Sequence, residues 1–356
     1  MYRLFFPALA AALTLLVSLG ADAQTTYQNF PATARFVVVA AGLPDGTFLV
    51  YNGDEVFRQD APGADAFTSI ASGYDGDPSF LTVAPNGTFA ALGAGGFTDP
   101  YTGDIYGFDV SAPANFTPAA VEVNRNHFAA AFLTDDLLLI DAGVFPDSEL
   151  AIVDLSAKSG ERALRTVARK PKADKTLVVD PKPGFSANVY HDAARDRVYA
   201  MDSNTRELRY FSAAALISAF NTASTLDWTT DGTQVGATGV YYSSGVVGVS
   251  PGGDLIIGGS EGFGLPGGIQ LVDPDTGAIR NTVDPAGDEG FAAAAYNAAS
   301  DELLVQQSGA VYSLTSSDLE PAPAGPTPGV PAMSGFGLAA LAAGLGLLLV
   351  KNGRRK

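Results

Sequence analysis

The feature that most constrains the fold is a unit of two β-rich runs joined by a tight polar turn, which occurs six times along the chain. The six units read RFVVVAAG-LPDG-TFLVYNG, SFLTVA-PNG-TFAALGAG, FAAAFL-TDD-LLLIDAG, SANVYHDA-ARD-RVYAMDS, VVGVS-PGGD-LIIGGSE and FAAAAYNA-ASD-ELLVQQSG. Their turns start at Leu43, Pro85, Thr134, Ala194, Pro251 and Ala298, so successive turns are 42, 49, 60, 57 and 47 residues apart. Asp-Gly, Asn-Gly and Gly-Gly-Asp provide the positive φ angles that tight hairpins need. The pattern predicts an all-β chain of repeated hairpins.

A third strand-like run follows each hairpin, and most units contain a fourth. The third runs are EVFRQD, DIYGFDV, ELAIVDL, ELRYFS, GIQLVDPDTG and AVYSLT, and AFTSIAS and TLVVD are examples of the fourth. The run IQLVDPDTG resembles the third strand and exit turn of many β-propeller repeats. Four strands per unit at this spacing predict a β-propeller of six blades, with seven as the alternative if a long unit contains another. A β-sandwich or a two-domain all-β chain would need another explanation for six similarly ordered hairpins.

The two ends of the repeat region complement each other. The last unit stops after Leu314 without a fourth strand, while residues 25–30 form a strand-like run before the first unit. We therefore predict that this N-terminal run completes the final blade and closes the ring. The predicted propeller body spans residues 24–319.

Residues 1–23 have the layout of a secretory signal peptide. Arg3 opens a charged segment, and residues 4–19 are apolar except for two hydroxyl side chains. The small-x-small cleavage pattern consists of Ala21, Asp22 and Ala23, so cleavage is predicted before Gln24. The apolar run is short for a membrane span. We expect the rest of the chain to be exported.

The C-terminal end predicts a transmembrane helix. A Pro-rich linker at residues 320–331 leads into the predicted helix, residues 332–350, whose last eighteen residues contain a single polar side chain, Ser334. At ~1.5 Å per residue, eighteen residues span ~27 Å, which is enough to cross the hydrocarbon core of a bilayer. Residues 351–356 carry four basic side chains, which should stay cytoplasmic and leave the body outside the inner membrane.

The tail begins with the run VPAMSGFG. This run resembles the IPTL-CTERM sorting signal, a relative of PEP-CTERM, whose motif reads IPTLSEWG. Identical positions are Pro331, Ser334 and Gly337, conservative replacements are Val330, Met333 and Phe336, and departures are Ala332 and Gly335. The resemblance covers roughly the last 27 residues. It implies a Gram-negative envelope protein whose tail is cut by an exosortase-type membrane protease, releasing the body to the cell surface or the extracellular matrix. A permanent single-span anchor is the alternative.

The body is strongly acidic and contains no cysteine. Residues 24–350 carry 16 Lys and Arg against 37 Asp and Glu, a net charge of −21. Such a surface repels phosphates, so nucleic acid is not an expected partner. Without cysteine, disulfides and thiolate metal sites are excluded, and stability has to come from a sizeable apolar core.

One segment departs from the acidic background. Between Lys158 and Lys182, eight basic side chains face three acidic ones, a local balance of +5. The residues predicted to contact an anionic partner, such as acidic polysaccharide, lipopolysaccharide phosphate or an acidic neighbour, are Arg165, Arg169, Lys170, Lys172 and Lys175. A solvated loop without a partner is the alternative interpretation.

No motif for nucleophilic or zinc chemistry occurs in the sequence, and its two histidines, His127 and His191, stand outside HExxH and GxSxG patterns. The strongest catalytic alternative resembles six-bladed propeller lactonases, in which oxygen ligands from several inner strands hold a divalent cation in the central channel. Polar residues just before or early in the predicted inner strands are Asp77, Asn126, His127, Asn188, Asp288 and Glu289. Oxygen ligands of this kind would suit Ca²⁺.

The sequence therefore predicts an exported β-propeller that acts as a binding or structural module, without a cofactor, at the cell surface or in the biofilm matrix. Expected partners are an exosortase-type protease and either polysaccharide or another envelope protein. A divalent-metal-dependent hydrolase or lactonase acting at the channel is the alternative function. We expect Trp228 to belong to the core. A sugar-stacking surface is the alternative role for this side chain.

Overall fold

The computed structural model describes residues 25–31, 39–74, 77–95, 103–115, 117–122, 126–144, 147–156, 175–182, 184, 188–236, 242–260, 267–284, 293–307 and 309–320. The chain divides into two compact units, Met1–Glu320 and Pro321–Lys356, and every described residue belongs to the first. The predicted signal peptide, sorting motif and transmembrane segment lie outside the described residues. Among the residues that are described, no helix has the length and apolar character to span a membrane.

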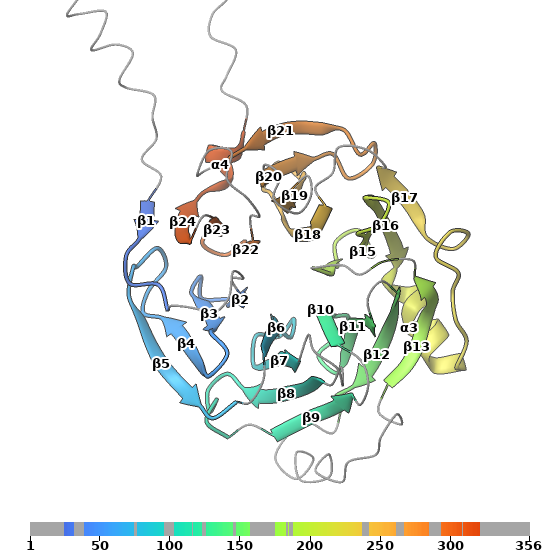
Figure 1. The fold of residues 1–356 in the computed structure, drawn as a ribbon, viewed down its shortest axis with the longest axis horizontal. Helices are drawn as coiled ribbons and strands as arrows, with labels where there is room; N and C mark the ends of the chain where they lie inside the picture. Colours follow the sequence, from blue (N-terminus) through green and yellow to red (C-terminus); the bar gives the residue numbers. More distant parts are fainter. Residues whose placement is uncertain are drawn as a thin grey trace, which may run out of the picture. The chain divides into compact units, whose positions relative to one another are not determined.

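Six antiparallel sheets of four strands surround a central axis, which makes the first unit a six-bladed β-propeller (Figure 1). Blades 1 to 3, each from the inside outward, are β2 (Val39–Gly42), β3 (Phe48–Tyr51), β4 (Glu55–Gln59), β5 (Phe67–Ser72); β6 (Asp77–Val83), β7 (Phe89–Gly95), β8 (Gly103–Asp109), β9 (Thr117–Glu122); and β10 (Asn126–Phe132), β11 (Leu137–Val144), β12 (Asp147–Asp154), β13 (Lys175–Lys182). Blades 4 to 6 are β14 (Tyr190–Asp192), β15 (Arg197–Asp202), β16 (Glu207–Ser212), β17 (Thr233–Gly236); β18 (Tyr242–Val249), β19 (Leu255–Ser260), β20 (Gly267–Val272), β21 (Ile279–Val283); and β22 (Ala293–Asn297), β23 (Glu302–Gln307), β24 (Ala310–Leu314), β1 (Thr25–Tyr27). The prediction of six four-stranded blades is confirmed.

The N-terminal strand closes the ring, as predicted. β1 pairs antiparallel with β24, with Thr25 opposite Ser313 and Tyr27 opposite Val311. The Tyr27 hydroxyl donates a hydrogen bond to a carboxylate oxygen of Glu302, at the start of β23 in the same blade. Burial, followed by the contact with this carboxylate, raises the pKa of Tyr27 above its usual range. The strand is therefore held by both its backbone and a buried polar contact.

The same strand also contacts blade 1. The Tyr27 and Phe67 rings meet edge to face with centroids 5.9 Å apart, and the Phe30 and Phe67 rings do so at 5.1 Å. Asp65, in the loop before β5, accepts hydrogen bonds from the backbone N–H groups of Gln28 at 2.7 Å and Asn29 at 3.0 Å. β1 therefore joins the last blade to the first.

The core of the propeller lies between blades. Among the described residues, six clusters of buried apolar side chains occur, one at each interface between neighbouring blades. Successive residues of one strand point to opposite sheet faces, so Leu138 and Ile140 pack toward blade 2 while Leu139 packs toward blade 4. Because both faces are buried, the strands read as nearly continuous apolar runs, which explains LLLIDAG and LIIGGSE in the repeats.

In the described part of the chain, two short helices stand beside the sheets. α3 (Ala213–Thr222) follows β16 and packs its buried Leu216 and Ala219 with β13 of blade 3, so it covers the outside of the blade 3 and blade 4 interface. The Ser212 hydroxyl caps this helix by accepting a hydrogen bond from the Ala215 N–H at 3.2 Å. α4 (Ser316–Leu319) follows β24, and its Leu319 carbonyl accepts a hydrogen bond from Asn281 of β21 at 2.7 Å.

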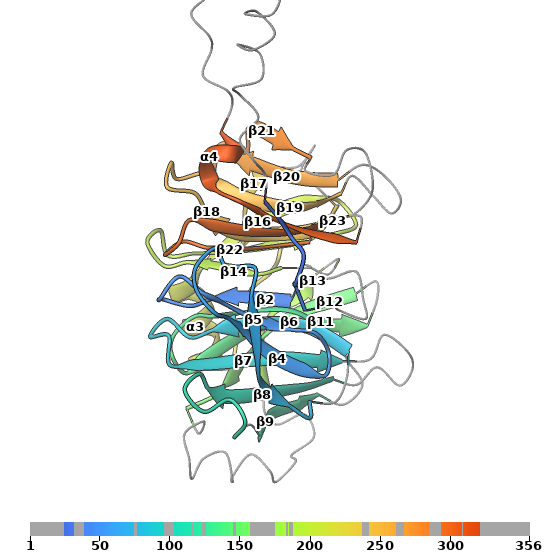
Figure 2. The same cartoon turned by 90° about the vertical axis from the view of Figure 1, so that its left-hand side faces the viewer.

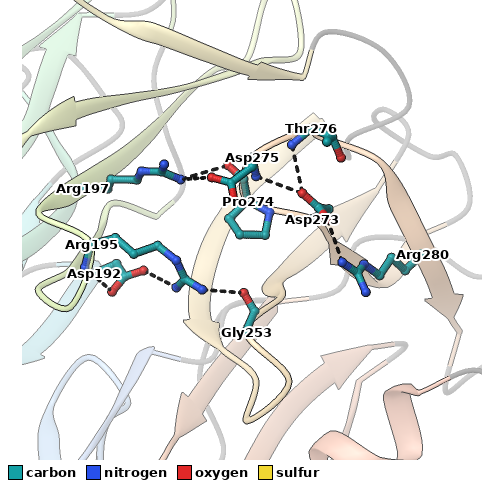
Figure 3. Close-up of polar contacts among 9 residues, drawn as sticks. All are labelled: Asp192, Arg195, Arg197, Gly253, Asp273, Pro274, Asp275, Thr276 and Arg280. Atoms are coloured by element: carbon teal, nitrogen blue, oxygen red, sulfur yellow. Dashed lines mark hydrogen bonds and ion pairs between the residues drawn. The ribbon is translucent and has the colours of Figure 1, made fainter.

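Arginine contacts fasten blade 4 to blade 5 (Figure 3). Arg195 donates to the Gly253 carbonyl at 3.1 Å. Arg197 donates to the Asp275 carboxylate at 2.8 Å and to the Pro274 carbonyl at 3.2 Å. All of these groups belong to the turns or the first strand residues of the two blades, which lie next to each other around the ring. In the edge view of Figure 2, β21 and α4 lie close together near the top of the picture.

Candidate functional site

The inner strands surround a cavity of about 320 Å³. Its lining residues come from the first strand of every blade and from residues that flank these strands: Ala40, Ala41, Gly42, Leu81, Thr82, Val83, Pro85, Ala130, Ala131, Phe132, Asn188, Val189, Tyr190, His191, Ala193, Val246, Val247, Ala294, Ala295 and Tyr296. In β2, β6 and β10 the lining residues are the last three of the strand, and in β22 they are the three before its last residue, Asn297. The cavity therefore lies toward the end where the inner strands leave the channel, called here the exit end.

Small side chains create the space. Alanines stand in pairs before three of the turns, at residues 40–41, 130–131 and 294–295. Four of these alanines, Ala130, Ala131, Ala294 and Ala295, are also buried in the clusters between blades, so larger residues there would overpack those interfaces. Glycine also lets the inner strands approach closely: a Cβ on Gly248 would lie 2.4 Å from Cδ1 of Tyr296, so the ring of Tyr296 occupies the place of a side chain there.

His191 lines the cavity and contacts the backbone of the neighbouring blade. Its Nδ1 lies 3.0 Å from the backbone carbonyl oxygen of Phe132. A carbonyl can only accept, so Nδ1 is the donor in this contact. The contact also joins blade 4 to blade 3, which fixes the orientation of the imidazole.

Tyr190 and Tyr296 are also among the lining residues. Burial, together with the nearby Asp192 carboxylate, raises the pKa of Tyr190 to about 12, so its phenol stays neutral at physiological pH. Tyr296 donates a hydrogen bond to Asp301 at 2.8 Å, and its pKa is raised above the usual range by burial and by this carboxylate. The Tyr296 proton is therefore already committed to a protein acceptor.

The predicted channel ligands lie mostly at the other end of the inner strands. Asp77 is the first residue of β6, and Asn126 and His127 open β10. At ~3.3 Å per strand residue they stand roughly 10 Å or more along the chain from the cavity-lining residues of the same strands. Asn188 lines the cavity. Asp288 and Glu289 lie outside the described residues, so their convergence with the others stays a prediction.

The described lining does not fit a divalent cation. It contains no Asp, Glu, Lys or Arg, and its side-chain amide and aliphatic hydroxyl oxygens come from Asn188 and Thr82. Ca²⁺ takes six to eight oxygen ligands, usually with carboxylates among them. Nowhere in the described part of the chain do three His, Cys, Asp or Glu side chains come together in a way that could hold a metal.

The predicted anionic-partner segment is described only at its end. Arg165, Arg169, Lys170 and Lys172 lie outside the described residues, and Lys175 is the first residue of β13. Lys182, the last basic residue of that run, is not a surface charge. Its side chain is 0% exposed, and Nζ lies 3.0 Å from Oδ2 of Asp141, which is also 0% exposed.

The surroundings of Lys182 form a closed polar group, called here the Lys182 cluster: Asp141, Ser148, Lys182 and the Gly184 carbonyl. Nζ donates to Ser148 Oγ at 3.2 Å and to the Gly184 carbonyl oxygen. Ser148 Oγ in turn lies 2.8 Å from Asp141 Oδ1. Burial lowers the pKa of Lys182, while the Asp141 carboxylate opposes that shift. Trp228 packs nearby, with Nζ 5.3 Å from its ring centroid, and is itself buried, as predicted.

Inspection of the strand entries missed the exit-end cavity. Asp and Asn at the start of a strand attract attention because they can bind metals, whereas the cavity depends on alanine pairs and on one histidine. The usable signal was the repeated Ala-Ala before a turn, because a close-packed inner strand would favour larger apolar residues. His191 follows Tyr190 directly in such a position.

The fold and site can now be compared with known proteins. No family model and no curated protein match this sequence. Solved propellers do match: a gluconolactonase from Xanthomonas campestris has 10% identity and a TM-score of 0.50 over 78% of this chain and 86% of its own. A chain of a nidogen/laminin complex has 10% identity and a TM-score of 0.52 over 74% and 85%. An auxiliary nutrient binding protein from Bacteroides thetaiotaomicron has 9% identity and a TM-score of 0.51 over 78% and 68%. Identities this low show the fold alone.

Proposed function

We propose that this protein is a non-catalytic binding propeller whose ligand occupies the exit-end cavity. The observation that carries the proposal is a space of about 320 Å³ where all six inner strands meet, with His191, Tyr190, Asn188 and Thr82 among its lining residues. Small-molecule sites are concave, have a volume of ~300–1,000 Å³ and contain a few polar groups that orient the ligand. A hydrolase would need a nucleophile, an acid–base pair or a metal at the same place.

A fragment screen by ligand-observed NMR tests this role. Ala193→Trp, at a lining position that is exposed, should obstruct the cavity and abolish the binding of fragments that reach it, whereas Ala223→Ser, in the turn after α3, should leave binding unchanged. Circular dichroism and the unfolding midpoint show whether each variant is folded. If no fragment binds the parent protein in a way that Ala193→Trp removes, the cavity is not a binding site.

A channel lactonase or other metal-dependent hydrolase is the competing function. Its support is that Asp77 opens β6 and that Asn126 and His127 open β10, the inner strands of two neighbouring blades. The binding proposal predicts no turnover of lactones or aryl esters with or without Ca²⁺. Turnover that chelator removes and that Asp77→Ala abolishes would favour the hydrolase instead.

We further propose that the propeller is exported and sorted through its two ends. The support is the signal-peptide layout of residues 1–23, the apolar segment 332–350 with its basic end, and the resemblance of VPAMSGFG to IPTL-CTERM. The body would be released to the cell surface or matrix by an exosortase-type protease, with polysaccharide or another envelope protein as its neighbour there. The basic residues Arg165 to Lys175 are candidates for that contact.

Intact mass spectrometry of the protein recovered from cell fractions tests the export proposal. A mass that begins at Gln24 and lacks the residues after the sorting motif is expected in the surface fraction. A chain that begins at Gln24 and keeps its C-terminus in the membrane fraction would indicate a permanent anchor. A chain with both ends intact in the cytosol would contradict export.

A further inference from the structure

The inner strand of each blade has one edge without a strand partner. In every four-stranded sheet the innermost strand, β2, β6, β10, β14, β18 or β22, is hydrogen-bonded to a single neighbouring strand. Its other edge faces the central axis around which the sheets are arranged (Figure 1). The side chains of such a strand stand perpendicular to the sheet and pack between blades, so the backbone of this edge forms the wall of the channel.

The strand register of blade 1 decides which backbone groups point into the channel. The N–H of Leu43 donates to the carbonyl of Thr47 at 2.8 Å, and Ala41 stands two residues earlier in the same register. In an antiparallel ladder, hydrogen-bonded pairs alternate with pairs that are not bonded to each other. Leu43 and Ala41 are therefore bonded to β3. The N–H and C=O groups of Ala40 and Gly42 point away from β3, into the channel.

The strand opposite β2 agrees with this assignment. Phe48 lies opposite Gly42, and its N–H donates to the side chain of Gln59 on β4 at 3.2 Å. This N–H therefore points away from β2, as it has to in a pair that is not bonded to each other.

Blades 2 and 3 repeat the pattern. Their turns close with backbone hydrogen bonds of 2.8 Å from Ala84 to Phe89 and from Leu133 to Leu137. By the same alternation, the residues whose N–H and C=O groups point into the channel are Leu81, Val83, Ala130 and Phe132. His191 of blade 4 reaches the carbonyl of Phe132, which requires that this oxygen points away from β11.

These edges give the exit-end cavity donors and acceptors in equal number. Ala40, Gly42 and Val83 line the cavity, and each presents one N–H and one C=O group to it. In the described part of the chain, no protein group is bonded to these three edges. Backbone groups of this kind keep their hydrogen bonds through water or through a ligand. A ligand that displaces this water therefore has to donate and accept side by side.

Hydroxyl groups meet this requirement better than ions do. A hydroxyl donates one hydrogen bond and accepts two, whereas an ammonium only donates and a carboxylate only accepts. The net charge of −21 on the body also lowers the local concentration of anions. The cavity of about 320 Å³ exceeds the ~150 Å³ that holds benzene, so a six-membered ring fits together with its hydroxyl groups.

We propose that the exit-end cavity binds a small, uncharged, polyhydroxylated ring through the backbone edges of the inner strands. This inference rests on the proposed binding role and names its ligand class. The contacts are the N–H and C=O groups of edge residues such as Ala40, Gly42 and Val83. The register of the inner strands, rather than a particular side chain, then determines what the cavity selects.

Four probes with one ring size test the class: myo-inositol, cyclohexanol, cyclohexanecarboxylate and cyclohexylamine. Binding to the full chain in nanodiscs is measured by ligand-observed NMR at neutral pH, and Ala193→Trp in the same nanodiscs corrects for partition into lipid. Myo-inositol is expected to bind tightest. Cyclohexanol should bind at least about tenfold weaker, because several hydrogen bonds to the edges are lost. The two charged probes should show no binding that Ala193→Trp removes.

Two neighbouring alanines provide a matched pair of backbone variants. Ala40→Pro removes an N–H that points into the channel, and proline is tolerated where its missing N–H faces away from the ladder. It should stay folded and weaken myo-inositol about three- to tenfold. Ala41→Pro removes an N–H that is bonded to β3, so its unfolding midpoint should be the lower of the two.

Hydrogen exchange at single-residue resolution gives a readout in the parent protein. In the free protein, the N–H groups of Ala40 and Val83 should exchange faster than those of Ala41 and Thr82, which are bonded in the ladder. Myo-inositol at about ten times its dissociation constant should slow the exchange of Ala40 and Val83 about tenfold. The exchange of Ala41 and Thr82 should not change.

The outcomes separate the ligand class from the binding role. If cyclohexanol or a charged probe binds tightest and Ala193→Trp removes it, the cavity is a binding site but the ligand class is wrong. If myo-inositol binds Ala40→Pro as tightly as the parent, or slows the exchange of Ala41 and not of Ala40, the backbone edge is not the contact. If no probe shows binding that depends on Ala193, this inference is overturned, and the fragment screen decides the binding role separately.

Discussion

The exit-end cavity and the Lys182 cluster both lie within the propeller, but they differ in how their polar groups are used. The polar groups of the cluster contact one another, whereas the cavity leaves space between the inner strands. In the Lys182 cluster, the Nζ of Lys182 is fully buried and meets Asp141, Ser148 and a backbone carbonyl within hydrogen-bonding distance. The cavity instead leaves a space of about 320 Å³, and His191 is among the residues that line it. The difference shows that burial of a titratable group does not by itself mark a functional site. A better criterion for a binding site is open space beside a polar atom that can still form a hydrogen bond.

The largest effect is expected from a substitution that breaks the Lys182 cluster. Lys182→Met leaves the Asp141 carboxylate buried without its cation, so the free energy of unfolding should fall by ~3–5 kcal/mol. Removing both charges, in Lys182→Met with Asp141→Leu, should restore most of that loss. Chemical denaturation measures all three proteins.

The exposed pair of Arg58 and Asp45 is the control for that experiment. Their side chains are 40% and 48% exposed. Arg58→Ala should cost less than ~1 kcal/mol, because water screens an exposed pair. If Lys182→Met costs no more than Arg58→Ala, the Lys182 cluster does not differ energetically from a surface ion pair.

The next effect concerns the cavity wall at alkaline pH. The pKa of Tyr190 is raised from 10.0 to about 12, chiefly by burial, so the folded protein keeps a proton that the unfolded chain releases. The stabilisation from this group is complete below pH 10 and is lost as the pH rises from about 10 to 12, by up to ~2.7 kcal/mol. Unfolding free energies measured across that range should fall less steeply for Tyr190→Phe. Identical slopes would show that this phenol is not shielded from water.

A smaller effect is expected at the closure of the ring. Tyr27→Phe keeps the ring packing but removes the donor to Glu302, so the free energy of unfolding should fall by ~1–3 kcal/mol. A double-mutant cycle with Glu302→Gln measures whether the two residues act through each other. Additive effects would mean that the buried contact contributes nothing to closure.

The smallest effect compares two alanines. Ala41 lines the cavity and is half-buried, whereas Ala151 is 0% exposed in the core between blades 2 and 3. Ala41→Val should change the free energy of unfolding by less than ~0.5 kcal/mol, because its added methyl groups have space. Ala151→Val should cost ~1–3 kcal/mol through overpacking. Equal costs would show that the cavity wall is as tightly packed as the core.

The fold could be predicted because its signals are local. Turn residues such as Asp45-Gly46 and Asn86-Gly87 mark hairpins within a few residues, and counting strands was enough to assign Thr25–Tyr27 to the last blade. α3 was not predicted, because a short alanine-rich helix depends on packing against β13 of another blade.

The candidate site was harder, because it depends on residues that meet only when the ring is closed. Nothing in the neighbourhood of His191 in the sequence indicates that its Nδ1 reaches the Phe132 carbonyl of the preceding blade. In the same way, Lys182 reads as part of a basic run, and only the position of Asp141 on β11 shows that its charge is compensated inside.

The pairing of Tyr27 with Val311 also has a consequence for the way the chain is made. The first strand can contact blade 1 early, but the strand with which it pairs, β24, is synthesised only after nearly the whole body, so its edge stays without a strand partner until then. Contacts this far apart in sequence form slowly, and an open edge invites pairing with another copy. A nascent chain that stops before Ala310 would lack β24, so the edge of β1 would stay unpaired. Completion of the last blade is therefore the step that removes this edge.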